Sequence, residues 1–206
     1  MAFPTTAVLD NFNRADGSPP SGWSQPLYTG DGNITINTNQ LALSTGTAAN
    51  GWLDGATYGP DCEVYCTIPT LPSDGNPTDL FARVADPGTA TPDGYQLRQW
   101  QDASQDYFEV RRIDNGVGTT LGATINQTFA AGDSFGMSIV GSTIEVWYKP
   151  SAGAWTSLGT RTDGTYGSAG YLGIQIWFGT VRVDDFGGGT IAAAGTRRDA
   201  MLLGVG

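Results

Sequence analysis

The sequence has no histidine, only two cysteines and only three glutamates among its 206 residues. Without histidine, Ser-His and Cys-His catalytic mechanisms have no general base, and a zinc site lacks its usual ligands. Glycosidases need two carboxylates about 5–9 Å apart across a cleft. Glu63, Glu109 and Glu145 each stand alone in a different strand-like run. No phosphate-binding Gly-x-x-x-x-Gly-Lys motif is present either, and we therefore expect the protein not to be an enzyme.

Positive charge is also scarce, with 10 Lys and Arg against 20 Asp and Glu and a net charge of −10. This balance argues against nucleic acid or an anionic membrane as a partner, because both attract basic surfaces. No apolar run approaches the roughly 18 residues that span a bilayer. The segment 1–6 has neither a basic nor an apolar region, so we expect no signal peptide and synthesis in the host cytoplasm.

Apolar residues make up 39% of the chain, enough for a core, and 30 glycines and 11 prolines punctuate it. Short apolar runs bounded by turn residues are typical of strands, and no stretch before residue 186 keeps helical periodicity beyond about two turns. The expected strands are 8–12, 33–36, 40–44, 61–69, 79–85, 94–101, 106–113, 134–140, 143–149, 154–158, 170–178 and 180–186. The sequence therefore predicts an all-β fold, with hairpins at Gly141-Ser142 and within 111–117.

The two cysteines, Cys62 and Cys66, fall in one predicted strand, where both point to the same face with Val64 between them. At about 3.3 Å per residue they are roughly 13 Å apart. A disulfide needs Cα atoms within about 7 Å. We therefore expect two free thiols, buried as small apolar side chains.

Several segments in order carry a resemblance to a known family. The run Asp10-Asn11-Phe12-Asn13-Arg14-Ala15-Asp16, followed by Gly22-Trp23, resembles the opening of concanavalin A-like, laminin-G-type jelly-roll modules. Segments at 61–68, 94–98, 131–134, 140–146 and 183–186 are similar to later strands of that family. The resemblance covers about residues 7–187 and implies an antiparallel jelly-roll β-sandwich. Modules of this kind with short C-terminal extensions look similar to ones in tailed-phage virion proteins.

Both ends of the predicted domain are short strands that carry acidic residues, so we expect the first and last strands to pair and their carboxylates to converge. The resemblance implies a structural Ca²⁺ at such a place, since calcium prefers six to eight oxygen ligands. The candidate ligands are Asp10, Asn13, Asp16 and Asp185. The alternative is that these side chains form turns and caps.

Strand alternation places polar and aromatic side chains on outer faces. The residues so placed are Gln96, Arg98, Trp100, Trp147, Gln175 and Trp177, and Tyr107, Glu109 and Arg111 extend the surface. Tryptophan with Gln and Arg suits sugar binding, and tryptophan with Arg equally suits a protein interface. A third interpretation is that loops such as 45–60 or 86–93 cover the rings. Trp23 and Trp52 are assigned to core or loop packing.

Composition changes after Phe186. We predict that the jelly-roll domain ends at residue 187 and that residues 188–206 are a Gly-rich hinge and a C-terminal arm. The arm is either a disordered tail or a docking segment for a partner subunit. Its docking residues would be Arg197, Arg198, Met201, Leu202 and Leu203.

Together these features lead to two functional hypotheses. The first is a non-catalytic virion structural protein, decorating a capsid or associated with a tail, that acts through protein contacts and forms a homo-oligomer. The alternative is a lectin-like module that binds host or environmental polysaccharide. Hydrolysis is not expected, because jelly-roll glycosidases usually carry Glu-x-Asp-x-x-Glu on one strand and this chain lacks that motif.

Overall fold

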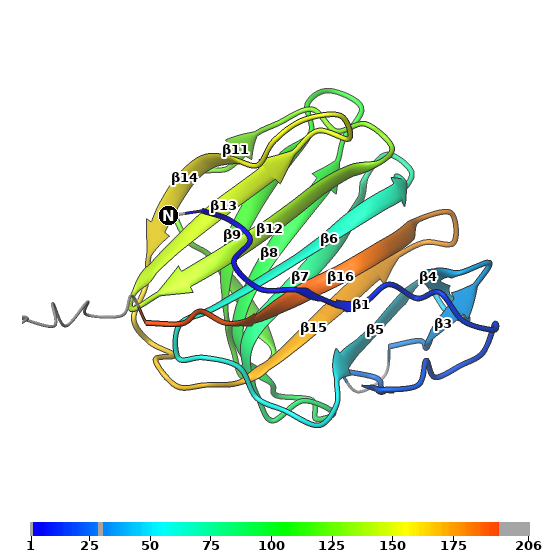
Figure 1. Cartoon of the computed structure of the whole chain (residues 1–206), viewed down its shortest axis with the longest axis horizontal. Coiled ribbons are helices and arrows are strands. Elements are labelled where there is room, and N and C mark those ends of the chain that lie inside the picture. Colours follow the sequence, from blue (N-terminus) through cyan, green and yellow to red (C-terminus); the bar gives the residue numbers. More distant parts are fainter. Residues whose placement is uncertain (1, 29–30, 194–206) are drawn as a thin grey trace, which may run out of the picture.

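A computed structural model describes residues 2–28 and 31–193, which form two antiparallel sheets packed face to face (Figure 1). One sheet, which we call the back sheet, lies nearer the viewer in Figure 1. It has the order β14 (Thr156–Thr162), β13 (Thr143–Lys149), β12 (Asp133–Val140), β6 (Cys62–Thr70), β16 (Arg182–Thr190), β4 (Gln40–Leu43) and β3 (Ile34–Asn37), with β1 (Val8–Asp10) paired to β16. The front sheet has the order β10 (Val117–Thr120), β9 (Tyr107–Asp114), β8 (Asp93–Gln101), β7 (Asn76–Ala85), β15 (Tyr171–Trp177), β5 (Ala48–Leu53) and β2 (Trp23–Ser24), with β11 (Ile125–Asn126) paired to β9.

These two sheets confirm the predicted all-β, antiparallel jelly-roll sandwich. The part of the chain that the structure describes contains no helix, and therefore none long and apolar enough to cross a membrane. The predicted hairpins are also present: β12 and β13 pair through Val140 and Thr143, and β9 and β10 through Asp114 and Val117. Asn115 lies in the second turn at a positive φ of 50°, a conformation that asparagine tolerates well.

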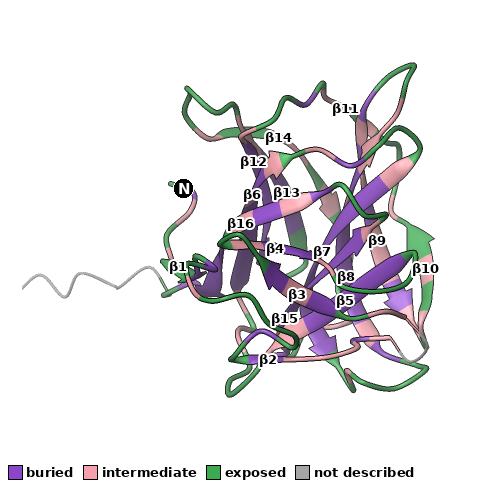
Figure 2. Cartoon of the chain, turned by 90° about the vertical axis from the view of Figure 1, so that its right-hand side faces the viewer, coloured by how far each residue is buried: buried purple, intermediate pink, exposed green. Residues whose placement is uncertain are grey.

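The core lies between the two sheets, where Figure 2 shows most of the buried residues. Strand β6 shows why the sequence folds this way. Cys62, Val64, Cys66 and Ile68 alternate toward the opposite sheet and are almost fully buried, while the residues between them point outward. Both cysteines are free and buried, which confirms the prediction of unbridged thiols.

The first and last strands lie side by side, as the sequence predicts. Strand β1 pairs antiparallel with β16, and Asp10 lies opposite Phe186. Behind this seam the Trp23 ring packs edge-on against Phe186 with ring centroids 4.9 Å apart. Trp23 is therefore a core residue, which agrees with its predicted role.

The predicted hinge is wrong, because Gly187–Gly189 belong to strand β16 and are buried. They pair with β6 in register with Tyr65, Val64 and Glu63. A side chain at Gly187 would collide with the Tyr65 ring, so glycine lets that ring lie across the strand. The sandwich thus continues to Ile191, whose amide donates to the Asp61 carbonyl over 2.9 Å.

One other expectation differs from the structure. The segment 45–60, expected as a covering loop, contains β5, which pairs along most of β15. Its Ala-Ala-Asn-Gly sequence lacks the β-branched residues that mark strands, so no local pattern predicts this strand.

The arm residues Arg197, Arg198, Met201, Leu202 and Leu203 lie outside the described residues, so their docking role stays a prediction.

Candidate functional site

The outer face of the front sheet carries a row of polar side chains that crosses four strands. Asp79 on β7 lies opposite Gln175 on β15 and opposite Arg98 on β8, and Arg98 lies opposite Glu109 on β9. Gln96, Trp100 and Trp177 flank this row on β8 and β15. The structure therefore brings five of the six predicted surface residues together.

An ion pair fixes the centre of the row. Arg98 binds Asp79 through two parallel hydrogen bonds, Nε to Oδ1 over 2.8 Å and Nη2 to Oδ2 over 2.9 Å. Asp79 is fully buried, whereas 14% of the Arg98 side chain is exposed. Burial disfavours the guanidinium charge, but Asp79 outweighs this effect and raises the pKa of Arg98. The pair thus presents a fixed, charged hydrogen-bond donor at the surface.

Half-buried tryptophans lie on both sides of Arg98. Its guanidinium carbon is 5.5 Å from the centroid of the Trp100 ring and 5.8 Å from that of Trp177. The Trp177 indole donates to Asp79 Oδ2 over 3.1 Å, and the Trp100 indole donates to Glu109 Oε2 over 3.1 Å. These bonds hold both rings in place, so the face is organised before any ligand arrives.

A cavity of about 150 Å³ adjoins this cluster. Tyr28, Gln96, Arg98 and Arg111 line it, and the Arg111 guanidinium donates to Gln96 Oε1 over 3.0 Å. Burial and the neighbouring Arg98 charge lower the pKa of Arg111. Burial also raises the pKa of Tyr28, whose hydroxyl therefore stays protonated near neutral pH. The cavity offers several donors beside the Tyr28 ring.

Gln175 supports the face rather than presenting a free amide. Its Nε2 donates to Asp31 Oδ2 over 2.8 Å, and Asn50 donates to the same oxygen over 2.6 Å. Asn50 Oδ1 in turn accepts from the amides of Leu27 and Tyr28. These bonds fix the chain on both sides of residues 29–30 against the sheet, with Leu27 packed in a cluster with Phe81.

Asp79, Asn50, Tyr28 and Asp31 were not among the predicted site residues. The outward position of Asp79 can be predicted from the sequence, because alternation along 79–85 places it on the face opposite to that of buried Leu80. The positions of Asn50, Tyr28 and Asp31 follow from the packing of β5 against the chain around Tyr28 and Asp31, and no local sequence pattern predicts this packing.

Trp147 does not belong to this surface. It points outward as alternation predicts, but from the back sheet, and only 8% of it is exposed. Phe3 stacks flat on its ring with centroids 4.8 Å apart, and its indole donates to Ser138 Oγ over 3.0 Å. The prediction that Trp147 forms part of a ligand surface with the other tryptophans is therefore wrong. The N-terminal segment covers it.

Three of the four predicted calcium ligands, Asp10, Asn13 and Asp16, are near one another in sequence, but the four side chains make different contacts. Asp10 accepts two hydrogen bonds from Arg14, over 2.7 and 2.8 Å, one from the Trp23 indole and one from the Phe12 amide. Asp16 caps the Thr38 amide, and Asp185 is exposed. Asn13 is also exposed, and its amide donates to Asn11. Both carboxylate oxygens of Asp10 are therefore occupied by donors, and Asn13, Asp16 and Asp185 are exposed. The four residues thus do not fit a calcium site. Residues 2–28 and 31–193 contain no other cluster of acidic or cysteine side chains suited to a metal.

No family model and no curated protein matches the sequence. Solved structures share the fold. The carbohydrate-binding module CBM66 from Bacillus subtilis is 16% identical, with a TM-score of 0.61 over 82% of this chain and 94% of its own. The VIP36 exoplasmic/lumenal domain, bound to Ca²⁺ and Man2, is 13% identical, with a TM-score of 0.66 over 93% and 90%.

A third similar structure is the CBM2 module of the evolved Dit protein of Lactobacillus casei BL23 phage J-1. It is 12% identical, with a TM-score of 0.54 over 89% of this chain and 94% of its own. A β-glucanase from Bacillus licheniformis also has this fold. The chain is thus similar in structure to lectin-like and carbohydrate-binding jelly-roll modules, and at these identities the likeness concerns the fold.

Proposed function

We propose that this protein is a carbohydrate-binding, lectin-like module and that glycans bind the outer face of the front sheet. The observation that carries the proposal is the pair of half-buried tryptophans, Trp100 and Trp177, on either side of the Arg98 guanidinium. Sugar rings pack their C–H faces on indole rings, and their hydroxyls hydrogen-bond to charged and amide groups. The similarity in fold to carbohydrate-binding modules supports this assignment over a purely structural role.

The proposed activity is binding without hydrolysis. The two carboxylates of the front row are both engaged: Asp79 is fully buried against Arg98, and Glu109 accepts from Trp100. A glycosidase needs one carboxylic acid that can donate its proton and a second carboxylate that is free to act as base or nucleophile. We expect no new reducing ends when the protein is incubated with a polysaccharide that it binds.

A glycan-array screen of the purified chain tests the proposal, followed by titration of each hit. We expect Trp100→Ala and Trp177→Ala to lower affinity at least tenfold, which corresponds to about 1.4 kcal/mol. Trp155→Ala is the matched control, because Trp155 is a half-buried tryptophan beside Phe3 on the back sheet. Equal losses in all three variants, or a folded protein that binds no glycan, would contradict the proposal.

A second proposal concerns where the module works. We infer that it is a virion component, tail-associated or capsid-decorating, made in the host cytoplasm and acting as a homo-oligomer. The similarity in fold to a module of a phage Dit protein favours this setting, in which glycan binding would serve attachment to a host surface. Mass spectrometry of purified particles and light scattering of the isolated protein test it. Absence from particles would refute the virion location, and a monomer in solution would refute the oligomer.

A further inference from the structure

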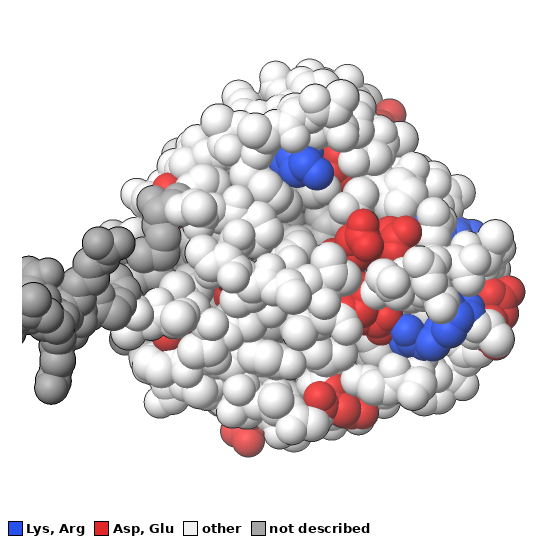
Figure 3. All heavy atoms as spheres, viewed as in Figure 1, with Lys and Arg blue, Asp and Glu red and all other residues white. Residues whose placement is uncertain are grey.

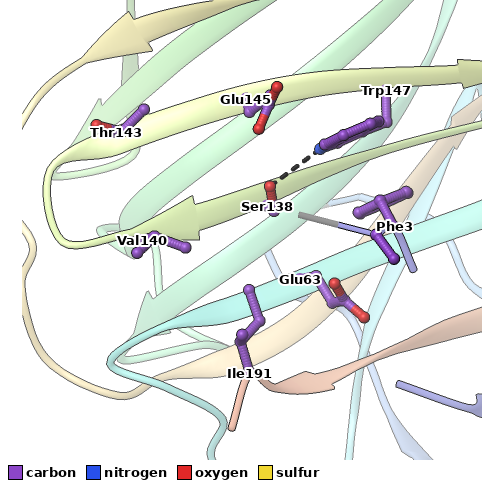
Figure 4. Close-up of a pocket in the computed structure, with 9 residues that line it drawn as sticks. Phe3, Glu63, Ser138, Val140, Thr143, Glu145, Trp147 and Ile191 are labelled. Atoms are coloured by element: carbon purple, nitrogen blue, oxygen red, sulfur yellow. Dashed lines mark hydrogen bonds between the residues drawn. The ribbon is translucent and has the colours of Figure 1, made fainter. Parts of the chain in front are cut away.

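A second cavity, of about 280 Å³, lies on the outer face of the back sheet (Figure 4). Glu63 on β6, Ser138 on β12 and Glu145 on β13 form one row across it, because Ser138 lies opposite both glutamates. Their Cα atoms are thus two strand spacings apart, about 10 Å. Neither glutamate has an arginine or lysine partner within the described residues. The cavity therefore holds two carboxylates that no described arginine or lysine pairs with.

Glu63 is the more unusual of the two, since only 1% of it is exposed. Its Oε1 accepts the amides of Thr5 and Thr6, each over 2.6 Å, and both threonine hydroxyls, over 3.2 and 2.8 Å. All four bonds end on Oε1, so no described residue donates to Oε2. Glu145 is similar: its Oε1 accepts from Ser157 over 2.5 Å and its Oε2 from none. Each carboxylate keeps one oxygen for an incoming donor.

Apart from Thr143, the rest of the cavity lining is apolar. Phe3, Val140, Trp147 and Ile191 contribute to it, and Val140 is 41% exposed. Figure 3 shows the protein from the side of the back sheet, where most of the surface is formed by uncharged residues. The matching ligand carries a cationic group, to meet the carboxylates, next to apolar side chains, to cover the walls.

The chain itself supplies such a segment directly beyond the cavity. Ile191 lines the cavity, and the sequence that follows contains Arg197 and Arg198, the only basic residues after Arg182, and then Met201, Leu202 and Leu203. Arg197 is six residues past Ile191, which at 3.3–3.6 Å per residue allows a reach of about 20 Å. That reach covers the whole cavity without a second chain.

We propose that residues 194–206 bind this cavity in the same chain, with the arginine pair at Glu63 and Glu145 and the apolar residues against Val140 and Phe3. This binding would place the arm on the back sheet and leave the front sheet open. The inference does not depend on the glycan proposal, since it concerns the opposite face.

Hydrogen exchange of the full-length protein, followed by mass spectrometry, tests this binding. We expect the amides of 194–206 to exchange at least about tenfold more slowly than in an unfolded peptide. Glu145→Gln and the double variant Arg197→Gln/Arg198→Gln should both restore the unfolded rate, as should salt near 1 M, where the Debye length is about 3 Å. Asp74→Asn, which removes one charge from an exposed loop, should leave the slow exchange unchanged.

Glu145 is chosen for the test because Ser157 is its only described hydrogen-bond partner, so the fold does not depend on it. Glu145→Arg should also release the arm, and adding Arg197→Glu and Arg198→Glu to that variant should restore slow exchange. Three results would overturn the proposal: unfolded-rate exchange in the full-length protein, slow exchange that none of these charge changes affects, or protection that disappears on dilution. The last would place the arm on another molecule.

Discussion

The two outer faces of the sandwich show that the direction of a side chain and its accessibility to a ligand have different causes. Both present tryptophan outward, Trp100 and Trp177 from the front sheet and Trp147 from the back sheet. On the front sheet the rings flank a fixed arginine and stay half-buried, whereas on the back sheet Phe3 lies flat on Trp147 and covers it. The period of a strand thus decides which way a side chain points. Segments outside the sheets decide whether a ligand can reach it.

The faces differ in charge as well. The front face sets its cation, Arg98, against a fully buried acid, so the pair is internally balanced. The back face holds Glu63 and Glu145 without a basic partner among the described residues. A balanced, rigid polar face suits a neutral ligand such as a sugar, whereas an unbalanced one suits a cation.

The largest expected effect comes from breaking the front-face ion pair. Asp79→Ala leaves Arg98 mostly buried without its partner and removes the acceptor of the Trp177 indole. We expect a loss of about 3–5 kcal/mol in the free energy of unfolding, measured by urea titration. Replacing both Asp79 and Arg98 by leucine should cost clearly less, because no charge is stranded. A loss below about 1 kcal/mol for Asp79→Ala would show that the pair does not organise the face.

Uncovering the back face should have a somewhat smaller effect. Phe3→Ala removes the ring that stacks on Trp147, and we expect a loss of about 3 kcal/mol in stability. Acrylamide quenching of tryptophan fluorescence should increase, and the increase should vanish in Phe3→Ala/Trp147→Phe. Glycan affinity at the front face should stay unchanged. Unaltered quenching would mean that Phe3 does not shield Trp147.

The third prediction concerns the seam that both faces share. Burial alone would raise the pKa of Asp10, but hydrogen bonds from Arg14, the Trp23 indole and the Phe12 amide outweigh burial and lower it. A lowered pKa in the folded state adds stability at pH values above the unfolded pKa, near 3.8, and this stability is lost as the pH falls through the folded pKa. Asp10→Asn should cost about 2 kcal/mol at pH 7 and less at pH 3.

Urea unfolding of the unaltered protein and of Asp10→Asn at both pH values measures this difference, and a cost independent of pH would contradict it. Because Asp10 lies on β1 of the back sheet and Trp23 on β2 of the front sheet, the variant should weaken the contact between the sheets and leave both outer faces intact. It should therefore change stability without changing glycan affinity at pH 7.

The smallest expected effect is that of calcium. A ligand that binds only the folded state raises its stability in proportion to the logarithm of its concentration over Kd. Hydrogen-bond donors surround Asp10, whereas Asp185 is exposed. We therefore expect the melting temperature of the protein to be the same in millimolar Ca²⁺ and in chelator. Asp185→Ala should lower it equally in both. A calcium-dependent melting temperature that Asp185→Ala abolishes would restore the metal site.

Most of the longer strands and much of the front face could be predicted from the sequence, because both follow from local alternation and turn residues. Gln96, Arg98 and Trp100 share a strand, so their common orientation could be deduced without the fold. Gln175 and Trp177 joined them through the pairing of β15 with β7. The same alternation could not separate Trp147 from them, since the order of strands in a sheet is a non-local property.

Other features depended on packing between distant segments. The glycines 187–189 have the composition of a hinge, yet they pair with β6 as a strand, and the missing side chain at Gly187 leaves room for the Tyr65 ring. Asp10 has the side chain of a calcium ligand, and only the folded positions of Arg14 and Trp23 show that its oxygens are occupied. Glu63 and Glu145 stand alone in their own strands, and β12 brings them into one row.

The most direct test of the central claim, that glycans bind the front face, is an NMR titration that follows the indole N–H signals of the six tryptophans. Assignment by single Trp→Phe variants, then addition of the best glycan from the array, would identify the rings in contact. The account predicts saturable shifts for Trp100 and Trp177 and none for Trp147 or Trp155. Shifts confined to Trp147 and Trp155, or no shift with any array glycan, would contradict it.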